Sequence, residues 1–233
     1  MYINTIKSMK SKLIILMLLA STVLSAQNNP LEKSVGDFTE VKVYDLIEVN
    51  LIKSEDNKVV ISGEDVQDVQ VINKNGKLKI RMILDKIFNG NKTFVEVHYK
   101  TIEIIDGNEG AFISSNELIE QGEILIKSQE GARIKVGLDV DKVEIRAVTG
   151  GIVETRGRAN SQEITLNTGG IYEGKGFETK NTKVNIKAAG EAEVNASEVV
   201  DATVRAGGDV YIYGNPETVK ENTLLGGRIS HRE

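Results

Sequence analysis

The sequence contains no cysteine and no tryptophan, and aromatic residues make up only 5% of its 233 residues. Without cysteine, no disulfide can cross-link the chain, so its stability must come from a hydrophobic core or from structural repetition. Carbohydrate sites often use the flat faces of tryptophan and tyrosine rings. The scarcity of aromatic residues therefore argues against a lectin without excluding one.

Groups that carry catalytic or metal chemistry are also scarce. Only two histidines are present, His98 in an alternating, strand-like segment and His231 near the C-terminus. The sequence has no HExxH motif, P-loop, GxSxG motif or calcium-binding glycine-rich nonapeptide. A lone histidine is far more often structural than catalytic. We therefore expect no catalytic residues, no metal site and no cofactor.

Basic residues are outnumbered, and only one long apolar run occurs. The formal net charge is -5, and no strongly basic segment is present to neutralise phosphates, which argues against nucleic acid as a partner. Three lysines precede the apolar segment 13–20, and residues 24–26 (Leu-Ser-Ala) fit a cleavage site. We predict a signal peptide over residues 1–26, whose removal leaves a net charge of -8 and no transmembrane segment.

The first half of the mature chain shows the period-two alternation that is typical of β-strands. A polar lead-in over residues 27–37 precedes it, and the alternation extends over residues 38–104. Asn75-Gly76 between two alternating segments indicates a hairpin, because both residues tolerate positive φ. We expect a strand-rich N-terminal lobe, either as a separate unit or as an irregular start of the same sheet system.

Residues 105–230 follow a repeat of about 20 residues. Small or apolar residues recur shortly after a glycine, at steps of 21, 21, 19, 20, 18 and 19 residues. They are Ala111, Ala132, Val153, Tyr172, Ala192, Val210 and Ile229. Each unit holds two short alternating segments with turn residues between them, and no helical period. This pattern predicts an all-β fold, a right-handed parallel β-helix-like solenoid of about 20 residues per turn with this column inside. An antiparallel sandwich is the alternative.

The same period predicts columns of outward side chains. One column on the second segment reads Arg133, Glu154, Glu173, Glu193, Tyr211, and its neighbour reads Lys135, Arg156, Lys175, Asn195, Tyr213. A mostly basic column on the first segment reads Lys127, Arg146, Asn167, Lys187, Arg205. Solvated, charge-compensated ladders are the ordinary interpretation. A sharper hypothesis makes part of these columns a ligand-binding surface, with the basic column tracking an acidic polymer. Its candidate residues are Lys127, Arg146, Lys187, Arg205, Tyr211 and Tyr213.

Several segments resemble a known family. The Gly-Gly-x-[Ile/Val] corners and the ending formed by residues 208–216 (GDVYIYGNP) and 225–229 (LGGRI) resemble the head GIN domain of auto-transporter adhesins. Residues 38–43 and 75–80 look like early strands of that family. The resemblance spans residues 36–230, so both lobes would form one domain. It implies β-strand repeats, export and a role in the periplasm or at the cell surface of a Gram-negative bacterium, and it brings no catalytic residue set.

Three functions remain open. The first is an exported, non-catalytic module that binds a glycan or an envelope or surface protein. The second is a periplasmic scaffold without a small ligand. The third is a polysaccharide-cleaving lyase or hydrolase that uses Glu154, Glu173 and Glu193 near Arg156 and Lys175. No burial cue separates the pKa values of these carboxylates and no long loops wall a cleft, so the sequence favours a non-catalytic module.

Both ends of the predicted solenoid need protection, because an uncapped end is a pairing edge. The polar residues 230–233 are candidates to cap one end, and the first-half strands are candidates to cap the other. We therefore expect no open-ended polymer, although the sequence does not fix the oligomeric state.

Overall fold

Sixteen β-strands and two short 3₁₀ helices, η1 (Val66–Asp68) and η2 (Leu84–Lys86), make up the regular structure of residues 30–233, the part of the chain that this computed structural model describes. The predicted signal peptide lies outside the described residues. The strands are β1 (Leu31–Ser34), β2 (Glu40–Val43), β3 (Glu48–Lys53), β4 (Lys58–Gly63), β5 (Val69–Lys74), β6 (Lys77–Met82), β7 (Thr93–Tyr99), β8 (Ile104–Gly107), β9 (Phe112–Gln129), β10 (Arg133–Val148), β11 (Ile152–Asn167), β12 (Gly170–Ile186), β13 (Gly190–Val204), β14 (Gly208–Tyr213), β15 (Thr218–Thr223) and β16 (Gly227–His231).

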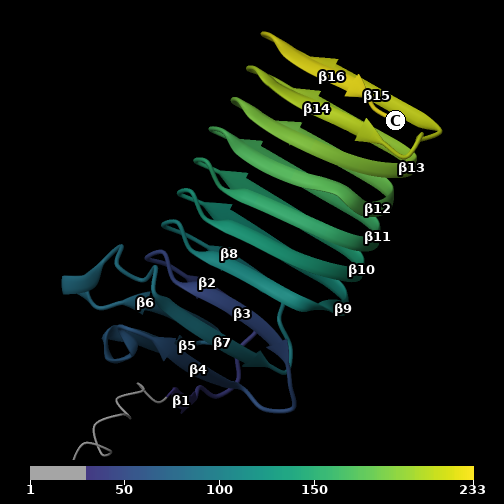
Figure 1. Cartoon of the computed structure of the whole chain (residues 1–233). Helices are drawn as coiled ribbons and strands as arrows, with labels where there is room; N and C mark the ends of the chain where they lie inside the picture. The colour runs from purple at the N-terminus through teal and green to yellow at the C-terminus, as the bar shows by residue number, and fades with distance from the viewer. Residues whose placement is uncertain (1–29) are drawn as a thin grey trace, which may run out of the picture.

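From residue 104 to residue 231 the chain winds through about seven turns of about 19 residues each (Figure 1). Strands β9 to β13 are 15 to 18 residues long because each follows one side of the coil, bends at a corner and continues along the other side. Equivalent residues of successive turns pair in parallel, as Ile134 does with Val153 and Val153 with Tyr172. The all-β solenoid is confirmed, and the parallel pairing rules out the antiparallel sandwich.

The coil has two flat sides, which we call face 1 and face 2. Face 1 is formed by β2, β5, β6, β8, β15 and the second halves of β9–β13. Face 2 is formed by β1, β3, β4, β7, β14, β16 and the first halves of β9–β13. Successive side chains of a strand point to opposite sides, so every second residue on each face is inside the coil. The face on which a residue lies, and whether its side chain points into or out of the coil, therefore decide which residues it can contact.

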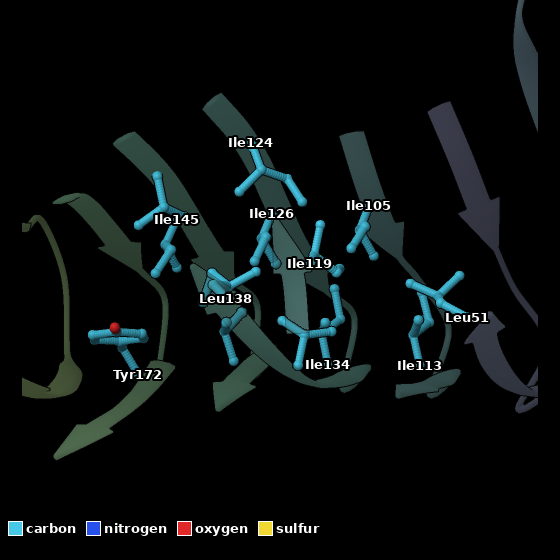
Figure 2. Packing of buried hydrophobic residues seen from close by; sticks show 14 of the residues in the cluster. Leu51, Ile105, Ile113, Ile119, Ile124, Ile126, Ile134, Leu138, Ile145 and Tyr172 are labelled. Atoms are coloured by element: carbon cyan, nitrogen blue, oxygen red, sulfur yellow. The ribbon is translucent and has the colours of Figure 1, made fainter. Parts of the chain in front are cut away.

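The core is a narrow layer between the two faces. Ile105, Ile126 and Ile145 extend from face 1 toward Ile113 and Ile134 on face 2 (Figure 2), and all five are fully buried. Burying each such side chain contributes roughly 1.5–3 kcal/mol, so repetition along the coil stabilises the chain without disulfides. One continuous hydrophobic cluster extends from Phe38 to Ile212.

The inward column differs from the predicted one in its first two members. Ile113 and Ile134, not Ala111 and Ala132, align with Val153. The two alanines occupy the preceding corner, where Ala132 accepts a hydrogen bond from the backbone of Ile152. The two alanines thus belong to the turn, and the prediction that they line the inner wall of a strand is wrong.

This corner explains the glycines of the later turns. A Cβ on Gly151 would lie 2.1 Å from the carbonyl oxygen of Ser128, and one on Gly170 would lie 2.0 Å from that of Ala147. The two residues before Gly151, Thr149 and Gly150, adopt positive φ angles of 50° and 72°, which turn the chain sharply from face 1 to face 2. Glycine is thus required at Gly151 by close approach of the backbone of the turn before it.

The N-terminal strands continue the same sheets. β2 pairs in parallel with both β6 and β8, and β3 pairs in parallel with both β7 and β9. The segment 40–53 therefore lies between segments 77–99 and 104–115, so the order of turns in space is not their order along the chain. This interleaving hides the repeat in the first half of the sequence.

The two ends of the solenoid differ. At the N-terminal end, β5 pairs antiparallel with β6, β4 pairs antiparallel with β7, and β1 adds to β4. Val66 on η1, in the connection between β4 and β5, is buried in the core. At the C-terminal end, β15 and β16 pair only with β13 and β14, respectively, among residues 30–233. The N-terminal end therefore finishes in antiparallel pairs whose outer strands are β1 and β5, and the C-terminal end finishes in the parallel edge strands β15 and β16.

Candidate binding surface

The six predicted binding residues do not form one surface. Lys127, Arg146, Lys187 and Arg205 lie on face 1, whereas Tyr211 and Tyr213 project from β14 on face 2. The hydrophobic core separates the two faces, so no single small ligand touches both groups. The basic residues and the tyrosines are therefore two separate candidate surfaces, and a binding role for either stays a prediction.

The four basic residues also fall into two columns rather than one. Arg146 aligns with Lys127 and with Thr165, not with Asn167. Ile186 pairs with Leu166, and Lys187 follows directly after Ile186. Lys187 and its neighbour Arg205 therefore lie two residues farther along the strands than Lys127 and Arg146 do.

Their electrostatic surroundings differ as well. The Arg146 guanidinium binds the Glu144 carboxylate, with an Nη2–Oε1 distance of 2.5 Å. Lys127, Lys187 and Arg205 have no acidic group within 4.0 Å among the residues that the structure describes. Three of the four cations therefore remain uncompensated by direct ion pairs.

Face 2 carries the predicted ladder of carboxylates. Glu154, Glu173 and Glu193 align in successive turns, and Tyr211 follows Glu193. Lys135, not Arg133, begins this column, because Lys135 pairs with Glu154 whereas Arg133 pairs with Ile152. The ladder continues without interruption from Lys135 to Tyr211.

Cations beside the ladder compensate its charge. Arg133 stands in the adjacent column and contacts Glu154 at 3.1 Å and Glu173 at 2.5 Å through Nη2, while Lys135 Nζ lies 2.8 Å from Glu154. Partial burial opposes ionisation of Glu154, but hydrogen bonds from Lys135 and Arg133 outweigh it and lower its pKa. Glu154 is thus held as an anion.

Two tyrosines end the ladder on β14. The Tyr213 hydroxyl donates a hydrogen bond of 3.3 Å to Glu193, and Lys175 Nζ lies 4.6 Å from the centre of the Tyr213 ring. Arg232 lies 4.8 Å from the centre of the Tyr211 ring. Burial and the negative charge of Glu193 raise the pKa of Tyr213, so it stays a neutral donor. Both rings are half-buried.

An open groove of about 480 Å³ runs over this part of face 2. Its lining includes Glu154, Arg156, Glu173, Lys175 and Glu193, and the groove extends to Glu191 and Gly176. It places carboxylate acceptors next to ammonium and guanidinium donors at the spacing of the turns, about 4.8 Å. Such a lining suits a ligand with many hydroxyl or amide groups, because both donors and acceptors are available across several turns.

A second open groove of about 520 Å³ lies along the corner where the long strands bend from face 2 to face 1. Its floor is formed by small residues, including Val140, Ala159 and Thr179. Asp139 and Arg158 line it as a two-fold hydrogen-bonded ion pair, with distances of 3.0 and 2.6 Å. Sequence reasoning missed this groove because it considered only the two strand segments of each repeat; the alternation of Asp139, Arg158 and Glu178 at successive turns was the available signal.

No cluster of three or more histidine, cysteine, aspartate and glutamate side chains in residues 30–233 is placed to hold a metal ion. Within the same residues, no helix is long and apolar enough to span a bilayer. Of the two histidines, His98 lies 3.6 Å from Glu96 on β7, and His231 lies 3.4 Å from Glu221.

These features define a class of protein: an all-β solenoid with regular polar outer faces and shallow grooves. Residues 37–216 match the family model described as "Putative auto-transporter adhesin, head GIN domain", and the chain belongs to this family. The resemblance seen in the sequence is confirmed. Membership of an auto-transporter adhesin family implies export of the chain.

Solved structures show the same fold. A "putative adhesin" from Bacteroides fragilis NCTC 9343 is 19% identical, with a TM-score of 0.80 over 87% of this chain and 96% of that chain. A "putative adhesin" from Parabacteroides distasonis ATCC 8503 is 18% identical, with a TM-score of 0.70 over 88% and 98% of the two chains. A "putative adhesin" from Parabacteroides merdae ATCC 43184 is 16% identical, with a TM-score of 0.66 over 90% and 98%. No curated protein matches this chain significantly.

Proposed function

We propose that this protein is an exported, non-catalytic binding module that attaches to a glycan or to another component of the cell envelope through face 2. The observation that carries the proposal is the groove over the Glu154–Glu173–Glu193 ladder, beside which the Tyr213 hydroxyl donates a hydrogen bond to Glu193. The family description as an adhesin supports a binding role. Periplasm and cell surface are the two locations that fit this role.

The chemistry of face 2 favours a hydroxyl-rich ligand. Glu173 and Glu193 offer acceptors, and Arg156 and Lys175 offer donors, on strands fixed by parallel pairing. Because successive turns repeat these groups, a polymer would engage several turns at once, and weak contacts would add up. Rigid strands also lower the ordering cost of binding.

We infer that the ladder binds without cleaving bonds. Lys135 and Arg133 lower the pKa of Glu154, so this carboxyl group is not suited to be the proton donor that glycoside cleavage needs. Incubation with acidic polysaccharides should release no reducing ends and no unsaturated products. Release that disappears in a Glu154→Gln/Glu173→Gln variant would establish the enzymatic alternative instead.

A glycan array followed by calorimetry tests the binding role, with the double variant Tyr211→Ala/Tyr213→Ala on face 2. Lys187→Gln/Arg205→Gln on face 1 is the matched control, because it also alters two exposed-face residues but on the opposite side of the core. Loss of about tenfold or more in affinity in the tyrosine variant alone supports the proposal.

The uncompensated cations of face 1 define a second candidate, an acidic polymer held by Lys127, Lys187 and Arg205. In that case, the calorimetric loss occurs in the Lys187→Gln/Arg205→Gln variant and not in the tyrosine variant. A protein that binds no glycan or envelope fraction at all supports the scaffold alternative. Protease treatment of intact cells separates the two locations, because only a surface-exposed chain is cleaved.

A further inference from the structure

The last turn of the solenoid changes the chemistry of the core columns. On face 1, the inward column of Ile164, Val184 and Ala202 continues into Glu221 on β15. On face 2, the inward residue Ile212 is followed by His231 on β16. Ionisable side chains therefore replace apolar ones on both walls at the same turn.

The side chains of Glu221 and His231 meet across the coil. His231 Nε2 lies 3.4 Å from Glu221 Oε1, and their side chains are 60% and 44% exposed, respectively. Beneath them, β13 and β14 present the apolar Ala202 and Ile212. The charged neighbours on their own strands are Lys220 and Arg232. The pair covers the end of the core with polar groups, and inward-pointing charge is one way in which proteins blunt a free sheet edge.

The last turn nevertheless keeps the features of a pairing surface. The outer edges of β15 and β16 are free, as described above, and Val219 and Ile229 are only partly buried at the end of the core. At the corner between the two strands, Leu224 and Leu225 are 60% and 78% exposed. Free backbone groups, an open core end and exposed leucines thus lie together at the yellow end of Figure 1.

We propose that two copies of this chain associate end to end through these last turns, as a closed two-fold dimer. The chain reverses direction at each corner, so β15 and β16 of one copy run in opposite directions. A two-fold axis parallel to the strands then places β15 of one copy against β16 of the other in antiparallel pairing. Because the two-fold axis joins the last turn of one copy to the last turn of the other in a single shared interface, the assembly closes at two copies.

Charge complementarity selects this arrangement. Because Glu221 and His231 of one chain lie opposite each other, the two-fold axis places Glu221 over the partner's His231, and His231 over the partner's Glu221. The four groups alternate in sign when both imidazoles are protonated. The same axis brings the leucine corners of the two copies together. A two-fold axis perpendicular to the faces would instead place Glu221 against the partner's Glu221, and such like charges repel.

The dimer does not depend on the binding role of face 2. It does determine how the two copies would present face 2 to a ligand. The two-fold axis places face 2 of the two copies on opposite sides of a rod of doubled length. A dimer would therefore present its two surfaces in opposite directions and could bridge two objects rather than bind one of them twice.

Sedimentation velocity of the purified protein tests the dimer at about pH 5.5 and about pH 8, since imidazole groups change charge between these values. We expect a dimer at the lower pH. A rise in pH should raise the dissociation constant by about tenfold or more, because each carboxylate loses its attraction to an imidazole once that imidazole is neutral. Glu221→Lys should abolish the dimer at both pH values, and the exchange Glu221→His/His231→Glu should restore it at low pH.

A second variant probes the strand edge without touching the charged pair. The Leu224 amide bonds to Val204 on β13, so by the alternation of a strand the Thr223 amide points to the free edge. Thr223→Pro should prevent pairing, and Asn222→Ala, an outward substitution on the same strand, should not. A chain that stays monomeric at about pH 5.5 and submillimolar concentration overturns the proposal. So does a dimer that Glu221→Lys and Thr223→Pro leave unchanged.

Discussion

The ring of Tyr172 fills the space that the missing side chain of Gly174 leaves inside the solenoid. A Cβ on Gly174 would lie 2.4 Å from two ring carbons of Tyr172, which is fully buried. Tyr172 stands in a column that otherwise holds isoleucine, valine and alanine. The narrow coil accommodates the large ring because the next inward position along β12 is empty.

The first prediction concerns this pair. Gly174→Ala should destabilise the protein by about 1–3 kcal/mol, because the new methyl group overlaps the buried ring. Gly176→Ala is the matched control, since a Cβ there meets nothing within 4 Å. Urea unfolding measures both. In the Tyr172→Val background the cost of Gly174→Ala should fall, and an equal cost in both backgrounds would contradict the steric explanation.

The second prediction concerns the hydrogen bonds of the same ring. The Tyr172 hydroxyl lies 2.7 Å from Thr155 Oγ1 and donates to Gln162 Oε1 at 2.8 Å, and both partners are buried. Tyr172→Phe leaves the Gln162 oxygen unpaired and should cost about 1–3 kcal/mol. Gln162→Leu removes that oxygen, so the double variant should lose less than the sum of the single variants. Strict additivity in urea unfolding would show that the two groups are not coupled.

The third prediction concerns the corner near the N-terminal end. Burial and the negative charges of Asp45 and Glu130 raise the pKa of Glu109. A raised carboxyl pKa means that the folded state binds the proton more tightly, so stability falls as the pH rises above the ordinary glutamate range. Glu109→Gln should therefore raise the melting temperature at pH 7, and the gain should shrink as the pH falls toward about 4. A variant that is less stable at pH 7 would contradict this sign.

The fourth prediction separates two reasons for glycine at one corner. Gly151→Ala should cost at least about 2 kcal/mol, because the added Cβ would meet the Ser128 carbonyl at 2.1 Å. Gly150→Ala should cost only about 1 kcal/mol, since its φ is 72° but nothing lies within 4 Å of the added atom. Chemical denaturation of both variants compares close approach with backbone strain. Equal losses would contradict the view that close approach at Gly151 costs more than backbone strain at Gly150.

Much of the architecture follows from local patterns. Alternation with period two indicates strands, and the recurrence near 20 residues indicates stacked turns. Both patterns follow from the local geometry of the chain and can therefore be seen in the sequence. The order of the carboxylate ladder is correct for the same reason, since Glu154, Glu173 and Glu193 follow corners of one kind. Lys135 replaces Arg133 in that column because the corner before β10 carries Ala132 where later corners carry glycine.

The candidate site was only partly predictable. The sequence identifies outward positions, but Tyr211 and Lys187 lie on opposite faces because the chain changes sides at each corner. The alternating charges of Asp139 and Arg158 are visible in the sequence, but the groove beside them depends on how the strands bend. Placement of the segment 40–53 between two later segments likewise depends on long-range pairing.

By itself, the sequence determined an all-β solenoid, its glycine corners and its lack of cysteine and metal-binding motifs. These features can be read from each repeat without knowing which residues it contacts. Only the tertiary structure decided which residues meet across the coil. Tyr172 with Gln162, and Glu221 with His231, come from different strands, and their contact depends on the width and register of the whole turn. Pairing between turns sets that register, and side chains distant in sequence then become neighbours.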